Sequence, residues 1–267
     1  MAWAIHGISL KADNLAASVG FFSDVIGLGA PETAEDGGAV FESNGYHLKL
    51  ARPPRQASTL DDRLRLQVLC QHLIIATSDL ASIEFAFDQA DIPFLRAGGG
   101  DEAAAIFAMT PAGHVVGFRE TEAPHSAKVT DGWGIHHVNL EAADVRETTT
   151  FFTQYTGLTE GSWNAPEARG DFSIDPMTLA VLPLDASNRG LHIIQPDPGF
   201  AIRNGFAHNP SLGGHPAFIV PDVFEVKARL DAAGILVTDA GTFAIPGMHH
   251  IYAMDPSGNL IEVNQYL

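Results

Sequence analysis

The sequence predicts an α+β fold in which four βαβββ modules form two paired-module domains. A duplication is the first sign: the segment that begins at His6 recurs at His136, an offset of 130 (136 minus 6). A second duplication matches His72-Leu-Ile-Ile to His215-Pro-Ala-Phe, an offset of 143 (215 minus 72). The same order of elements then recurs four times along the chain, which is the mark of a repeated supersecondary unit.

Each module opens with a short β-like run, followed by Asp or Asn and an amphipathic stretch of helical length. Asp and Asn suit helix N-caps because their side chains accept hydrogen bonds from free backbone N–H groups. The opening strands are predicted at residues 5–10, 72–76, 137–140 and 216–220, and the helices at 15–26, 80–90, 145–155 and 223–233. Each helix is predicted to end at a Gly or Asp, namely Gly27, Asp91, Gly157 and Gly234.

Further strand-like runs close each module. They are predicted at residues 39–42 and 47–51, 104–109 and 115–120, 178–182 and 191–195, and 251–254 and 260–264. The segment Asp255-Pro-Ser-Gly has Pro second and Gly fourth, so it suits a type I turn between the last two strands.

Composition limits the possible functions. The 267 residues include 46% hydrophobic and 18% charged residues, which is typical of globular proteins. A net charge of −17 argues against nucleic acid as a partner. We find no run long enough to span a bilayer and no leader-like start. The single Cys70 fits a reducing cytoplasm. The segment 121–134 is the predicted linker between domains at residues 1–120 and 135–267.

The last module carries a distinctive segment, Tyr-Ala-Met-Asp-Pro-Ser-Gly-Asn-Leu-Ile-Glu, from Tyr252 to Glu262. With the four modules, it makes nearly the whole chain resemble the vicinal oxygen chelate superfamily. That superfamily includes glyoxalases, bleomycin-resistance proteins, fosfomycin-resistance enzymes and extradiol ring-cleaving dioxygenases. The resemblance implies the glyoxalase/extradiol dioxygenase fold, in which each pair of modules curls an eight-stranded sheet around a pocket. Because this fold hosts many reactions, function must be argued from the site.

In this superfamily, metal ligands come from the first strand of each module in a pair and from the last strand. The matching positions here are His137, His215 and Glu262. In the first pair of modules, the repeat places Gly7 at the position of His137 and Gly117 at the position of Glu262. Only His215 has a matching histidine there, His72. The resemblance therefore implies a metal in the second pair and none in the first. Two imidazoles and one carboxylate leave coordination positions open for a substrate.

Four modules with the metal in the second pair look most like type I extradiol dioxygenases. Their signature of Tyr, an acidic residue, Pro, Gly and Glu is matched from Tyr252 to Glu262. The resemblance implies Fe(II)-dependent extradiol cleavage of a catechol-type aromatic diol using O2. It makes His192 the acid–base residue and Tyr252 a hydrogen-bond partner of the substrate. A further signature His has no direct match, so His249 or His250 would replace it.

Two other interpretations remain open. If His192 is a fourth ligand, the site resembles glyoxalase-like and epimerase-like members, which act through an enediolate on Mn(II), Zn(II) or Ni(II) and need no oxygen. A third interpretation is a non-catalytic small-molecule binding protein. Iron with oxygen uptake would distinguish the first from the second. A homo-oligomer is expected in each case.

Strand position and loop composition suggest which residues meet the substrate. Asn139 is two residues after His137 and therefore shares its strand face. Arg203 and His208 lie in the polar segment before His215, and an Arg there would suit a carboxylate. Pocket-lining candidates are Trp163, Phe172, Met177 and Phe206, and residues 159–175 are predicted to cover the mouth. Strand alternation predicts that His136 faces away from His137.

Overall fold

The computed structural model describes residues 2–52, 72–97, 104–122, 129, 131–165 and 174–267. Cys70, Phe172 and much of the predicted linker and mouth segment lie outside these residues. The helices are α1 (Leu15–Gly20), which continues as the π-helix η1 (Phe21–Ile26), α3 (Leu80–Gln89), α4 (Val145–Tyr155), α5 (Phe200–Asn204) and α6 (Val223–Ala232). No described helix is long and apolar enough to cross a membrane.

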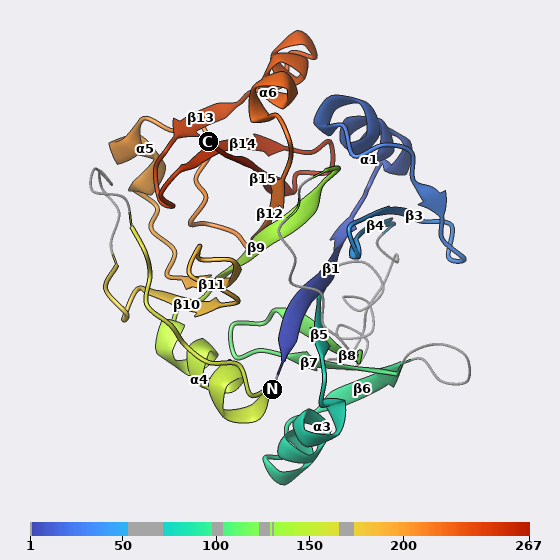
Figure 1. Ribbon diagram of the computed structural model, residues 1–267, viewed down its shortest axis with the longest axis vertical. Helices are drawn as coiled ribbons and strands as arrows, with labels where there is room; N and C mark the ends of the chain where they lie inside the picture. The colour runs from blue at the N-terminus through green and yellow to red at the C-terminus, as the bar shows by residue number, and fades with distance from the viewer. Residues whose placement is uncertain (1, 53–71, 98–103, 123–128, 130, 166–173) are drawn as a thin grey trace.

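Two mixed sheets follow the two predicted pairs of modules (Figure 1). The first has the order β2-β3-β4-β1-β5-β8-β7-β6. Its strands are β1 (Trp3–Lys11), β2 (Glu32–Thr33), β3 (Ala39–Ser43), β4 (Tyr46–Ala51), β5 (His72–Thr77), β6 (Phe94–Ala97), β7 (Ala105–Met109) and β8 (Val115–Glu120). The expected eight strands are therefore present in this sheet.

The second sheet has seven strands among the described residues, in the order β10-β11-β9-β12-β15-β14-β13. They are β9 (Gly134–Glu141), β10 (Leu179–Pro183), β11 (Gly190–Ile194), β12 (His215–Ile219), β13 (Thr238–Gly241), β14 (Met248–Met254) and β15 (Leu260–Tyr266). The prediction of eight strands is thus met by the first sheet and not by the described part of the second.

Helix boundaries follow the predicted capping residues. The side chains of Asn14, Asp79, Asp144 and Asp222 each accept a hydrogen bond from a backbone N–H in the first turn of their helix. Left-handed backbone ends the helices at Gly27, Asp91, Gly157 and Gly234, with φ of 88°, 53°, 70° and 69°. Both features come from local sequence, which is why the helix limits could be predicted closely.

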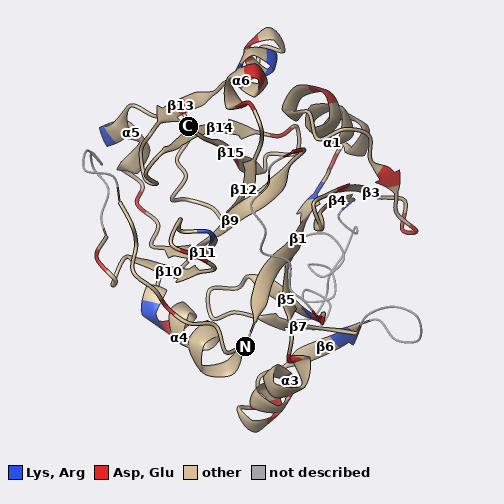
Figure 2. Ribbon diagram, viewed as in Figure 1, with Lys and Arg blue, Asp and Glu red and all other residues tan. Residues whose placement is uncertain are grey.

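One apolar core extends across the two sheets. Phe22 of η1 packs against Phe218 of β12 with ring centroids 6.0 Å apart. Phe87 of α3 stacks on Phe151 of α4 at 5.7 Å. Acidic side chains are distributed over the outer helices and loops, while the strands are mostly uncharged (Figure 2). The residue limits 1–120 and 135–267 for separate domains stay a prediction.

A β-bulge recurs at the same place in both sheets. The pairing of β1 with β5 skips His6, and the pairing of β9 with β12 skips His136. A bulge adds one unpaired residue, and this changes the direction in which that side chain points. Both opening strands therefore depart from strict alternation at their first histidine.

Candidate metal centre and substrate pocket

Three neighbouring strands bring the predicted ligands together. His137 lies on β9, His215 on β12 and Glu262 on β15, and these strands are adjacent in the sheet. All three side chains are buried, with residue exposures of 2%, 1% and 2%. Glu262 Oε2 lies 3.4 Å from His137 Nε2 and 3.4 Å from His215 Nε2.

The donor atoms fit a divalent cation. His215 Nδ1 lies 3.0 Å from the Gly213 carbonyl oxygen, which can only accept, so Nδ1 carries the proton and Nε2 keeps its lone pair. That lone pair and the Glu262 oxygen are both acceptors, so a cation between them could bind both. Adjacent ligands about 2.1 Å from a metal in octahedral geometry stand about 3 Å apart, close to the distances found.

Asn139 shows what must change when a metal binds. Its Nδ2 lies 2.8 Å from His215 Nε2, and its Oδ1 is buried without a hydrogen-bond partner. As the side chains stand, no group of three or more His, Cys, Asp or Glu residues in the described part of the chain is arranged to hold a metal ion. The Asn139 amide must therefore leave the His215 lone pair before that nitrogen can bind a metal.

The charge states suit metal binding. Burial alone would raise the pKa of the Glu262 carboxyl, but its histidine neighbours, His137 foremost, hold it well below its usual range. Burial lowers the pKa of His137, and burial lowers the pKa of His192 and of His136 well below the ordinary value. An ionised carboxylate beside neutral imidazoles is the state in which these groups bind metals.

His192 lies beside the proposed ligands on β11. Its ring stacks on that of His137 with centroids 4.0 Å apart, and Trp163 packs against it at 4.5 Å. His192 Nε2 lies 2.6 Å from the Asn188 carbonyl oxygen, so Nε2–H donates this bond. Its Nδ1 is then the nitrogen that keeps a lone pair, whether His192 acts as an acid–base residue or as a fourth ligand.

Strand β14 separates the two candidate histidines. His250 and Tyr252 face the pocket, and His250 Nδ1 lies 2.8 Å from Glu262 Oε1. His250 Nε2 is buried without a hydrogen-bond partner. His249 lies on the other face, 2.8 Å from Asp239 Oδ1 and packed against Phe224 of α6. Of the two, His250 is therefore the residue placed to meet a substrate.

Tyr252 stands opposite Glu262 in the strand register, and its ring lies 5.9 Å from that of His215. Burial, followed by the charge of Glu262, raises the pKa of Tyr252 well above its ordinary value. The phenol consequently keeps its proton and can donate a hydrogen bond into the pocket.

The pocket above these residues has a volume of about 350 Å³. Trp163, Phe200, Phe243 and Tyr252 contribute aromatic rings to its walls. Phe206 packs against three aromatic residues of this wall rather than lining the cavity. Met177 is 62% exposed and does not line the cavity either. No sequence pattern pointed to Phe200 or Phe243.

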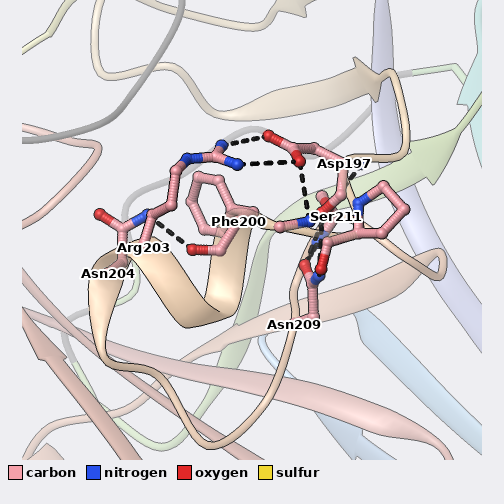
Figure 3. Close-up of polar contacts among 8 residues, drawn as sticks. Asp197, Phe200, Arg203, Asn204, Asn209 and Ser211 are labelled. Carbon is pink, nitrogen blue, oxygen red and sulfur yellow. Dashed lines mark hydrogen bonds and ion pairs between the residues drawn. The ribbon is translucent and has the colours of Figure 1, made fainter.

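The three residues predicted to contact the substrate differ in their position relative to the pocket. Asn139 lines the pocket. Arg203 lines its mouth, but its guanidinium forms a two-pronged ion pair with Asp197 (Figure 3). His208 lies away from the cavity, where its Nδ1 is 2.9 Å from Thr238 Oγ1. Because Thr238 of β13 binds this side chain, the geometry does not support a substrate contact for His208, and that contact stays a prediction.

The first sheet explains why its pair of modules lacks the triad. A Cβ atom on Gly7 would stand 2.6 Å from the His47 carbonyl oxygen. A Cβ on Gly117 would stand 2.5 Å from the Phe107 ring. The space that His137 and Glu262 occupy in the second sheet is therefore filled by other atoms in the first.

No protein-family model matches the sequence, and no curated protein matches it. Solved structures do match. A Mn(II)-bound glyoxalase from Novosphingobium aromaticivorans aligns with 100% of this chain and 84% of its own, with 17% identity and a TM-score of 0.63. The 2,3-dioxygenase LapB from Pseudomonas sp. KL28 aligns with 98% of this chain and 91% of its own, with 17% identity and a TM-score of 0.64.

A third structure, the 2,2',3-trihydroxybiphenyl 1,2-dioxygenase of Sphingomonas wittichii strain RW1, aligns with 98% of this chain and 91% of its own, with 15% identity and a TM-score of 0.64. Identities this low establish the fold and leave the reaction open. The chain therefore has the fold shared by these glyoxalase and extradiol dioxygenase structures, as its resemblance to the vicinal oxygen chelate superfamily implies.

Proposed function

We propose that the protein binds a divalent metal ion through His137, His215 and Glu262 and cleaves a catechol-type aromatic diol with O2. One observation carries the proposal: Glu262 Oε2 lies within 3.4 Å of both imidazole Nε2 atoms, at the buried end of an aromatic pocket. Fe(II) held there would supply neighbouring open positions for the two diol oxygens and for O2.

The protein's own groups would orient the diol and move its protons. The aromatic wall would hold the ring, and the Tyr252 hydroxyl would donate a hydrogen bond to a diol oxygen. His192 Nδ1 or His250 Nε2 would accept a hydroxyl proton, and the imidazolium so formed would return it to the product. In the overall reaction the ring C–C bond next to the diol breaks, and both atoms of O2 enter the product.

The mouth of the pocket favours uncharged diols. Arg203 is the only Lys or Arg among the described residues that line it, and Asp197 already neutralises that charge. We therefore expect catechols without a carboxylate to be better substrates than carboxylated ones, in contrast to the role for Arg203 suggested by the sequence. Comparing kcat/KM for a matched pair of such diols tests this.

The decisive experiment is oxygen uptake. Protein loaded with Fe(II) without air, and then given catechol, alkylcatechols or biphenyl diols with air, should consume O2 in proportion to diol and form a yellow ring-opened product. The Glu262→Gln variant is the control. Absence of uptake across the whole panel by metal-loaded protein would overturn the proposal.

A glyoxalase-like reaction is the second candidate. The stacking of His192 on His137 places its ring close enough to join the ligand set as a fourth donor. Isomerase activity with Ni(II), Zn(II) or Mn(II), and no oxygen uptake with Fe(II), would favour this function. The homo-oligomer and the cytoplasmic location stay predictions.

A further inference from the structure

The bulge on β9 brings a second histidine against a proposed ligand. His136 Nδ1 lies 2.8 Å from His137 Nδ1, with the two rings 5.1 Å apart and nearly perpendicular. Strict alternation would place these neighbours on opposite faces. The register of β9 with β12 skips His136, and this allows both imidazoles to meet. The prediction that His136 faces away from His137 is wrong for this reason.

A chain of hydrogen bonds continues from His136 to the surface. His136 Nε2 lies 2.9 Å from the Tyr266 hydroxyl, and that hydroxyl lies 3.2 Å from Ser187 Oγ. Ser187 Oγ lies 2.5 Å from Asp185 Oδ1. Tyr266 and Glu262 are on the same strand, so β15 contributes to both the ligand set and this chain.

The carboxylate at the outer end fixes the direction of every bond. Asp185 can only accept, so the Ser187 hydroxyl donates to it and can only accept from Tyr266. Tyr266 then donates to Ser187 and accepts from His136 Nε2–H. A neutral His136 protonated on Nε2 has a lone pair on Nδ1.

The directions of these hydrogen bonds determine whether the proposed ligand atom, His137 Nε2, carries a proton. His137 must donate its Nδ1–H to the His136 lone pair, so His137 Nε2 is left unprotonated and faces Glu262. The opposite direction would place a proton on His137 Nε2 and block metal binding. Partners that fix the tautomer of a ligand histidine strengthen metal binding, and their removal commonly weakens it about 10- to 100-fold.

We propose that His136 is a positioning residue that, through Tyr266, Ser187 and Asp185, holds His137 in the tautomer whose Nε2 binds the metal. This inference rests on the proposed metal site. It assigns a role to a buried histidine that the ligand set and the pocket do not use.

Three variants test the proposal. His136→Leu removes the acceptor, whereas His136→Asn offers an amide oxygen near the position of Nδ1. His6→Leu is the matched control, because His6 occupies the equivalent bulge in the first sheet. Titration calorimetry with Mn(II) should show binding about 10- to 100-fold weaker in His136→Leu, substantial recovery in His136→Asn and no change in His6→Leu.

A second measurement does not need metal. Nitrogen NMR of histidine-labelled, metal-free protein should show His137 protonated on Nδ1 in the wild type and shifted toward Nε2 in His136→Leu. If wild-type His137 is protonated on Nε2, the positioning role is overturned whatever the metal result. If the wild type binds Mn(II) and His136→Leu binds it equally well with an unchanged tautomer, this inference fails while the metal site stands. A wild type that binds no metal refutes the proposed function itself.

Discussion

Replacing Glu262 with Gln should separate the stability of the metal-free protein from its affinity for metal. The carboxylate is buried, accepts from His250 Nδ1 at 2.8 Å and faces the His137 lone pair at 3.4 Å. A Gln amide oxygen can still accept from His250. Its N–H₂ can donate to His137 Nε2, which replaces a contact between two acceptors with a hydrogen bond.

The magnitudes follow from these contacts. One new hydrogen bond contributes about 0.5–1.5 kcal/mol, but the fold also loses the ionised carboxylate that the low pKa of Glu262 shows it to favour. These two effects oppose each other, so the free energy of unfolding of the metal-free protein should change by no more than about 1.5 kcal/mol. Loss of a charged partner from a buried site costs about 3–5 kcal/mol, which corresponds to metal binding weakened about a hundred- to several-thousand-fold. Metal affinity should therefore fall far more than the stability of the metal-free protein changes.

Urea unfolding with a chelator present measures the first quantity, and calorimetry with Mn(II) measures the second. Glu141→Gln is the matched control. Glu141 faces His114 Nε2 at 3.5 Å in a separate cavity, and its side chain is 36% exposed. That variant should change neither quantity appreciably. A Glu262→Gln protein that binds Mn(II) as tightly as the wild type, or whose free energy of unfolding without metal differs from the wild type by several kcal/mol, would refute the reasoning.

Three further predictions test other parts of the structure. Burial lowers the pKa of His6 to about 4. The neutral form is therefore favoured on folding, and the stability it contributes is present above pH 6.5 and lost as the pH falls toward 4. Because the ring is partly exposed, the loss should be about 1–2 kcal/mol, seen as a smaller decrease of unfolding free energy in His6→Gln than in the wild type. Tyr252→Phe should retain Mn(II) binding and lower kcat/KM for diol cleavage about a hundredfold by oxygen electrode; unchanged kinetics would contradict a donor role. Gly7→Ala should lower the thermal midpoint because its Cβ meets the His47 carbonyl oxygen, with an expected cost of about 1–3 kcal/mol. Gly213→Ala, where the Cβ would meet open space, is the control.

Much of the fold could be predicted because its signals are local. The capping residues Asn14, Asp79, Asp144 and Asp222 set the helix starts without help from distant contacts. The duplicated order of elements predicted two sheets with equivalent opening strands, and two sheets are present. Because the residues at the ligand positions could be compared between the two pairs, the sequence also distinguished the pair that lacks the triad.

The direction of individual side chains could not be predicted in the same way. His250 stands two residues before Tyr252, so strand alternation could have separated it from His249 once the strand was known to be regular. The pairing of β14 with β15 is what brings His250 to Glu262. From the sequence, Arg203 suggested a site for a substrate carboxylate, but in the structure its guanidinium is paired with Asp197. His208 lay in a polar segment, but the hydroxyl that binds it belongs to β13.

The amino-acid sequence by itself determined the repeated module and the helix limits, because periodicity and capping depend on neighbours in the chain. Its resemblance to the vicinal oxygen chelate superfamily is what pointed to His137, His215 and Glu262. Only the tertiary structure decided that His136 joins His137 and that a chain of donors extends from it to Asp185. The physical reason is the bulge on β9, where one strand carries an extra residue against its partner. The register between two strands then sets the direction of the side chain, and this register depends on both strands together.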